Sequence, residues 1–156
     1  MNPLEAIGLL FALLAVTTVL GLVWRARQGR VASVTGAIIT PADVASPTAF
    51  GPAATLVQFS TELCARCPGT RRLLAAVAEQ RPGVVHVDVD LTHRADLANR
   101  YAVLQTPTTL ILDGSGRVQA RVGGAPSRAD INAALDAITQ NTTHRTVTST
   151  PGSSHV

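Results

Sequence analysis

Hydrophobic positions follow four patterns along this chain, and together they predict three kinds of element. Residues 6–24 form an apolar run of 19 residues without a charge, which is the length of a membrane-spanning helix. A short apolar run at 56–60 and the strict alternation of apolar and polar residues at 84–90 are typical of β-strands. Near the end of the chain, apolar residues recur at i, i+3, i+4 and i+7 from Ile131, which predicts an amphipathic helix.

The segment 53–138 reads as one α/β domain with the element order β-α-β-α-β-β-α. The predicted strands are 56–60, 84–90, 108–112 and 117–122, and the predicted helices are 64–80, 95–101 and a last one after Ser127. Pro82-Gly83 ends the first of these helices, and Asp113-Gly114-Ser115-Gly116 makes a hairpin turn. Crossover connections predict a parallel first pair of strands and helices on both faces of one central mixed sheet.

The remaining residues divide into three flanking segments. Residues 1–28 are an apolar anchor with a basic stop, and residues 29–52 are rich in Gly, Ala, Ser, Thr and Pro. This second segment reads as a linker with one short first strand at 37–39. Residues 139–156 are largely Ser and Thr and are expected to be a disordered tail.

The N-terminal apolar run predicts a single transmembrane helix. At ~1.5 Å per residue its 19 residues span roughly 28 Å, the thickness of a bilayer core. We expect residues 4–24 to contact lipid, with Trp24 at the interface. A cleaved signal peptide is the alternative, but it needs a basic start, and the only side-chain charge here is that of Glu5.

The charges that follow this run predict its orientation. Arg25, Arg27 and Arg30 come directly after it, and the positive-inside rule places such residues in the cytoplasm. The sequence therefore predicts a single-pass protein of the cell membrane with its C-terminal domain in the cytoplasm. An extracytoplasmic domain remains the alternative, because a translocated domain can override three charges.

Composition excludes several classes of protein. Hydrophobic residues make up 46% and charged residues 15%, which is too apolar for an intrinsically disordered chain. The net charge is +3 and the sequence pI about 9.7, but the basic residues are scattered and aromatic residues are only 3%. We therefore expect no nucleic acid partner. All basic residues are Arg, which is typical of a GC-rich genome, and two cysteines are too few for a disulfide scaffold.

The strongest chemical motif is Cys64-Ala65-Arg66-Cys67, placed after a predicted strand and at the start of a predicted helix. Unpaired N–H groups and the helix dipole stabilise a thiolate there, which makes Cys64 a candidate nucleophile. Cys67, three residues on, can then close a disulfide with it. The charge of Arg66 should favour the thiolate further.

The cysteine pair could also be two buried structural residues, or it could bind zinc. A zinc site needs two more ligands, and His86 and His93 are the only histidines of the domain, without a second CxxC. We therefore predict no metal site and no cofactor besides a redox-active disulfide.

A second candidate element is Thr106-Pro107, at the start of a predicted strand. Proline is tolerated at a first strand position, and a cis bond there would expose the Thr106 backbone to a substrate. The spacing alone leaves an ordinary strand-start proline equally open.

These segments together resemble the thioredoxin family. The resemblance is carried by LVQFSTELCARC, VVHVDVD, YAVLQTPTTLILDGSGRV and VGGAPS, in that order, over about residues 53–138. It implies a thioredoxin fold, a nucleophilic Cys64, a resolving Cys67 and a cis Pro107, with Gly123 in a third loop that faces the substrate. The full chain is similar to membrane-anchored thioredoxin-like proteins of bacteria.

The chain departs from the family pattern at positions close to the cysteines. Leu63 stands where thioredoxins have Trp, Ala65-Arg66 replaces Gly-Pro, and Pro68 replaces the usual Lys. Gln58 stands where thioredoxins have a buried acid that helps to deprotonate the resolving cysteine, and His86 stands in place of a nearby Lys. We expect Gln58 and Arg66 to change the redox behaviour of the pair, with the proton of Cys67 passing to water or His86.

The sequence thus predicts a membrane-tethered thiol–disulfide oxidoreductase. Its expected partners are protein disulfide or dithiol substrates and an upstream reductase or membrane electron donor. One alternative is an extracytoplasmic reductase for exported cysteines, including those of cytochrome c maturation. Others are a non-catalytic thioredoxin-fold adaptor and a metal-handling protein.

Overall fold

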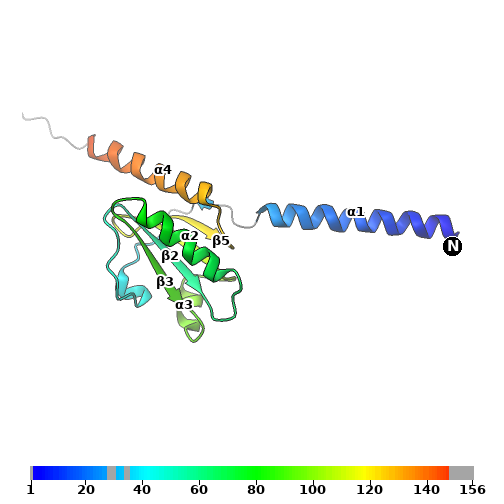
Figure 1. Ribbon diagram of the computed structural model, residues 1–156, viewed down its shortest axis with the longest axis horizontal. Helices are drawn as coiled ribbons and strands as arrows, with labels where there is room; N and C mark the ends of the chain where they lie inside the picture. The colour runs from blue at the N-terminus through cyan, green and yellow to red at the C-terminus, as the bar shows by residue number, and fades with distance from the viewer. Residues whose placement is uncertain (1, 28–30, 34–35, 148–156) are drawn as a thin grey trace, which may run out of the picture.

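The computed structural model describes residues 2–27, 31–33 and 36–147 (Figure 1). Its element order is α1 (Pro3–Arg27), β1 (Val31–Ser33), the 3₁₀ helix η1 (Pro41–Val44), β2 (Ala54–Ser60), α2 (Cys67–Glu79), β3 (Val84–Asp90), α3 (Ala95–Arg100), β4 (Thr108–Asp113), β5 (Val118–Gly123) and α4 (Arg128–Val147).

The strands form one mixed five-stranded sheet in the order β1-β5-β4-β2-β3. β2 is buried along its whole length, because β3 pairs with it in parallel and β4 pairs with it antiparallel. β4 and β5 form the hairpin expected from the sequence. In its turn, the Asp113 carboxylate accepts hydrogen bonds from the backbone N–H groups of Ser115 and Arg117, at 2.9 and 3.1 Å.

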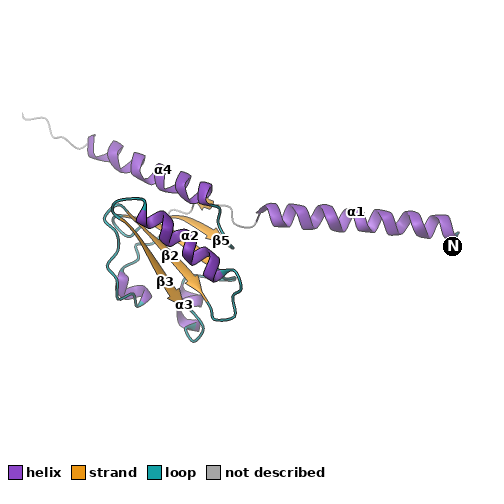
Figure 2. Cartoon of the chain, in the orientation of Figure 1, coloured by secondary structure: helices purple, strands orange, loops and turns teal. Residues whose placement is uncertain are grey.

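Helices cover both faces of the sheet, and each face has its own apolar core. α2 and α4 lie on one face, as Figure 2 shows, with Leu74 and Ile131 fully buried against β2, β4 and β5. On the opposite face, η1 and α3 pack against the strands through Val44 and Leu97. Phe59 stacks on Tyr101 there, with ring centroids 5.4 Å apart. The alternation of side chains along the strands is what separates the two cores.

The structure differs from the sequence predictions at several element boundaries. The first strand lies at Val31–Ser33, and the predicted strand at 37–39 contributes only an isolated bridge between Ile38 and Arg117. α4 continues through residues 139–147, where a disordered tail was expected; residues 148–156 lie outside the described residues. α2 begins at Cys67 and not at Cys64.

α1 stands apart from the α/β domain in Figure 1. Within the described part of the chain it is the one helix long and apolar enough to cross a membrane, over Glu5–Val23, and none of that segment is buried by the rest of the protein. The hydroxyls of Thr17 and Thr18 donate to the carbonyl of Leu14, at 3.0 and 2.7 Å. These bonds satisfy the hydroxyl groups of the segment within the helix itself.

Candidate active site

The cysteine pair lies in the turn that connects β2 to α2. The N–H of Cys64 donates to the Thr61 carbonyl at 3.2 Å, and the N–H of Cys67 donates to the Cys64 carbonyl at 3.1 Å. Arg66 is the N-cap of α2, Cys67 is its first residue, and Pro68 follows. Proline suits this first turn, because the N–H that it lacks would have no partner inside the helix.

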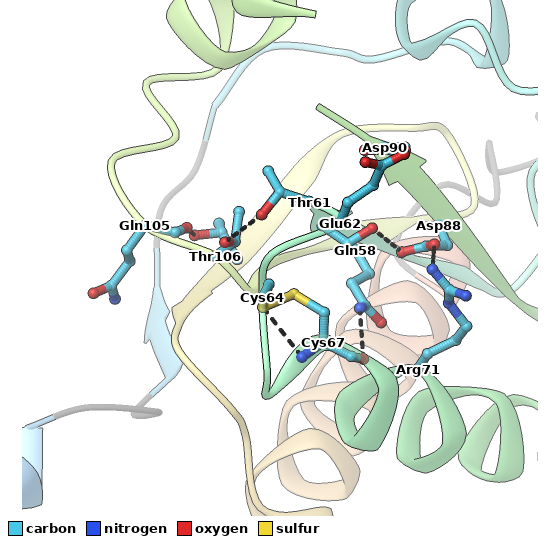
Figure 3. Close-up of a disulfide and its surroundings, with 12 residues drawn as sticks. Gln58, Thr61, Glu62, Cys64, Cys67, Arg71, Asp88, Asp90, Gln105 and Thr106 are labelled. Atoms are coloured by element: carbon cyan, nitrogen blue, oxygen red, sulfur yellow. Dashed lines mark hydrogen bonds and ion pairs between the residues drawn. A yellow bond between two sulfur atoms is a disulfide. The ribbon is translucent and has the colours of Figure 1, made fainter. Parts of the chain in front are cut away.

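Cys64 and Cys67 form a disulfide, and their exposure differs (Figure 3). Cys67 is 2% exposed, whereas Cys64 is partly accessible. The backbone N–H of Cys67 points to the Cys64 sulfur, at 3.1 Å. A hydrogen bond from a backbone N–H favours the charged form of a group, so this contact would stabilise a thiolate on Cys64 after reduction.

The start of α2 adds to this effect. The helix has 13 residues, and its first turn carries no acidic residue that would oppose a thiolate. Its macrodipole places partial positive charge near the sulfurs. Arg66 is exposed next to the pair, where its charge acts in the same direction.

Gln58 lies directly beneath Cys67. Its side chain is 0% exposed, and its amide Nε2 donates to the Cys67 carbonyl at 3.2 Å (Figure 3). The other amide atom, Oε1, is buried without a hydrogen-bond partner among the described residues, as is the hydroxyl of Thr109, which is opposite Gln58 on β4. Gln58 thus supports the backbone of the resolving cysteine and cannot act as a base.

The neighbouring strand β3 places Asp88, and not His86, level with Gln58. Asp88 is the partner of Gln58 across the parallel pair, while His86 pairs with Leu56. Asp88 accepts a hydrogen bond from the Ser60 hydroxyl at 2.9 Å and forms an ion pair with Arg71. His86 therefore lies about 6.6 Å further from the disulfide edge.

Burial controls the charge state of His86. Desolvation lowers its pKa below the ordinary histidine value; the negative charge of Asp88 opposes this effect, and the positive charge of Arg71 adds to it. Its Nε2 atom is buried and has no hydrogen-bond partner within the described part of the chain. His86 thus lies on the same face of the sheet as Gln58, two residue pairs further from the cysteines.

The opposite side of the site is the segment before β4. The Thr106–Pro107 peptide bond is cis. The hydroxyls of Thr61 and Thr106 lie 3.2 Å apart, which joins this segment to the loop that carries Cys64 (Figure 3). The N–H of Gly124 donates to the Pro107 carbonyl at 2.8 Å, so the loop after Gly123 borders the same segment. The tertiary structure thus brings the predicted substrate-facing residues to one edge of the sheet.

Two leucines flank this edge with nearly complete exposure. Leu63 is 98% exposed and directly precedes Cys64, and Leu104 is 94% exposed in the segment before Pro107. The sequence prediction did not include Leu104 or Thr61. An apolar residue three positions before a candidate cis proline was a usable signal for Leu104, whereas the role of Thr61 depends on a contact over 45 residues of sequence.

Comparisons with known proteins agree with this geometry. The Thioredoxin family model matches residues 48–137. The fold is similar to that of thioredoxin-2 of the malaria parasite, described as a component of its protein secretion machinery (20% identity, TM-score 0.50, covering 55% of this chain and 82% of that one). It is also similar to a mutant thioredoxin from Halobacterium salinarum (21% identity, TM-score 0.50, covering 55% of this chain and 74% of that one).

No curated protein matched the chain. The family model nevertheless spans more than half of the sequence and contains both cysteines, the cis proline and every strand from β2 to β5. The chain belongs to the thioredoxin family and is a thiol–disulfide oxidoreductase of that fold.

Proposed function

We propose that this protein is a membrane-tethered oxidoreductase that exchanges its Cys64–Cys67 dithiol and disulfide with protein substrates at the cytoplasmic face of the membrane. The observation that carries the proposal is the unequal exposure of the two cysteines at the start of α2. An accessible first cysteine can meet a substrate, and a buried second cysteine can only act within the protein.

In the reducing direction, the Cys64 thiolate attacks one sulfur of a substrate disulfide. A mixed disulfide forms, and the other substrate sulfur leaves as a thiolate, which takes up a proton. Cys67 then loses its proton and attacks the Cys64 sulfur, so the Cys64–Cys67 disulfide forms and the second substrate thiolate is released. Two electrons pass from the dithiol to the substrate, and the two substrate thiolates take up their protons from water. A reductase or a membrane electron donor must restore the dithiol.

The surrounding residues have two roles, in stabilising the Cys64 thiolate and in contacting the substrate. The Cys67 N–H, the α2 dipole and Arg66 favour the Cys64 thiolate, while the Thr106 backbone, Pro107 and Gly123 border the place where a substrate chain would lie. Gln58 supplies no base for the second step, and we propose that water accepts the proton of Cys67. We expect this second step to be slow in comparison with family members that carry an acid at this position.

Substrate trapping tests the exchange reaction. A Cys67→Ser variant of the full chain cannot resolve the mixed disulfide, so substrates should stay bound to Cys64 and be released by dithiothreitol. Cys64→Ser is the matched control and should trap nothing. If Cys67→Ser traps no protein and the wild type reduces no model disulfide, the chain acts as a non-catalytic adaptor.

The apolar segment Glu5–Val23 and the three arginines after it support the tether and its orientation. The test is labelling of the two cysteines in intact cells with a membrane-impermeant maleimide after an impermeant phosphine reductant, with lysed cells as the control. Labelling only after lysis supports a cytoplasmic domain. Labelling of intact cells would instead make exported cysteines, including those of cytochrome c maturation, the substrate class.

A further inference from the structure

The chain enters the α/β domain along β5 and runs antiparallel to it. The N–H of Gly36 donates to the Val118 carbonyl at 3.2 Å, and the N–H of Ile39 donates to the Gly116 carbonyl at 2.8 Å. Upstream of these bonds, β1 continues antiparallel to β5, and its first residue, Val31, is the partner of Val122. The polypeptide therefore leaves α1 and meets the sheet at the C-terminal end of β5.

The C-terminal end of β5 lies at the same end of the sheet as the disulfide. Val122 is paired with Thr109 on β4, and Thr109 is paired with Gln58 on β2. Gln58 in turn donates to the Cys67 carbonyl. One row of paired residues thus leads from the entry point of the chain to the resolving cysteine.

The tether between this edge and α1 is short. Four peptide units separate Arg27 from Val31 and can span at most about 14 Å. The three strand spacings from β1 to β2 add about 14 Å. These two lengths, together with the step from Gln58 to Cys67, keep the disulfide within roughly 35 Å of the end of α1. An extended, unpaired segment over residues 29–52 would span about 80 Å by itself.

The same edge carries the exposed apolar side chains of the site. Leu63 directly precedes Cys64 and Leu104 lies in the segment before Pro107, on two loops that Thr61 and Thr106 connect. Exposed apolar groups of this size, on the loops that carry the cysteine pair and the cis proline, fit a partner whose own cysteine lies beside apolar residues.

We infer that the substrates of the Cys64–Cys67 pair are cysteines of integral membrane proteins, held close to the bilayer surface at the end of a transmembrane segment. This inference rests on the proposed function, because it takes α1 as the membrane anchor. The short tether keeps the disulfide near the surface and raises its effective concentration there, at the cost of access to cysteines further out.

The inference is tested with the full chain in vesicles, by comparing the reduction of disulfides held at two distances from the membrane. The protein, reduced beforehand to the Cys64/Cys67 dithiol, is reconstituted with transmembrane peptides that carry one looped disulfide. In the near peptide, the disulfide lies within three residues of the membrane end; in the far peptide, a helical (EAAAK)₈ spacer holds it roughly 60 Å away. Single-turnover reduction is followed by thiol labelling. A soluble disulfide peptide is tested in parallel.

The tether is then lengthened by 40 Gly/Ser residues between Gln28 and Gly29, which adds a root-mean-square reach of about 35 Å. The matched control carries the same insertion after Thr148. We expect the wild type and the control to reduce the near peptide at least about tenfold faster than the far peptide, and the lengthened chain to lose most of this preference.

The outcomes separate this inference from the proposed function. Equal rates on the two peptides in the wild type, or a preference that the longer tether leaves unchanged, would overturn the inference while reduction of the soluble peptide keeps the oxidoreductase proposal intact. Failure to reduce any of the three peptides would overturn the oxidoreductase proposal itself. Loss of the protein from the vesicles on alkaline washing would overturn the tether.

Discussion

Replacing Gln58 by Glu places a titratable group of nearly the same shape under the resolving cysteine. The wild-type side chain is 0% exposed and donates from Nε2 to the Cys67 carbonyl. A glutamate can keep this hydrogen bond only in its protonated form, because an ionised carboxylate would set two acceptors against each other. Burial and this bond both favour the neutral acid, so the pKa of the new carboxyl should rise well above its ordinary value of about 4.3.

The sign of the pH dependence follows from this shift. The folded variant keeps a proton that the unfolded chain releases above about pH 4.3, so Gln58→Glu should approach wild-type stability below that pH and lose stability as the pH rises. The loss should be about 1.4 kcal/mol per pH unit until the raised pKa is reached. A shift of about three units, within the range of buried carboxyls, amounts to about 4 kcal/mol near pH 7.5.

The assay is thermal and urea unfolding of the full chain in detergent, followed by circular dichroism between about pH 3.5 and 8, which brackets the expected shift. Gln58→Leu is the control, because it removes the hydrogen bond without adding a titratable group. It should cost about 1–3 kcal/mol at every pH. If the stability of Gln58→Glu runs parallel to that of Gln58→Leu across this pH range, the site is not sealed from water and the reasoning is wrong.

The same variant also tests the proposed role of water in the second catalytic step. Once ionised above its raised pKa, the introduced carboxylate can accept the proton of Cys67, which Gln58 cannot do. General-base assistance of this kind is worth about 10²–10⁴-fold. Release of a fluorescent thiol from the Cys64 mixed disulfide should therefore accelerate with pH in Gln58→Glu more steeply than in the wild type. Equal pH profiles would show that loss of the Cys67 proton does not limit this step.

Three further predictions concern packing, pH and substrate contact. Gly114→Ala should lower the melting temperature, because the new Cβ would lie 2.0 Å from the Pro52 carbonyl oxygen. In Gly69→Ala, within α2, the new Cβ meets nothing within 4 Å, so this substitution should stabilise the protein by about 0.5–1 kcal/mol. Burial lowers the pKa of His86, so just below pH 6.5 the unfolded state binds a proton there and the folded state does not. The protein should therefore lose stability on acidification, and urea titrations at about pH 5–7 would measure this loss. The loss should diminish in His86→Gln and persist in a variant of the exposed His93. Leu104→Ser should raise KM for protein disulfides several-fold more than it lowers kcat, measured by steady-state reduction; a change confined to kcat would contradict substrate contact.

The local character of the chain was readable from its sequence. The apolar run, the strand alternation at 84–90, the hairpin turn at Asp113 and the CxxC motif each depend on neighbours within a few residues, and short-range periodicity and turn chemistry report such features directly. The order of elements and the parallel pair of β2 and β3 followed from connection rules. The family resemblance then identified the chemistry of the two cysteines.

Only the tertiary structure decided which distant segments of the chain contact one another. The contact of Thr61 with Thr106, the amide of Gln58 under Cys67 and the exposure of Leu104 depend on how strands and loops pack, and no local pattern encodes them. The largest difference lies before the domain, where the sequence predicted a linker with one short strand at 37–39. There, hydrogen bonds to the edge of β5 hold the chain as β1. Edge pairing of this kind needs few apolar residues, because its free energy comes from backbone groups that every sequence carries.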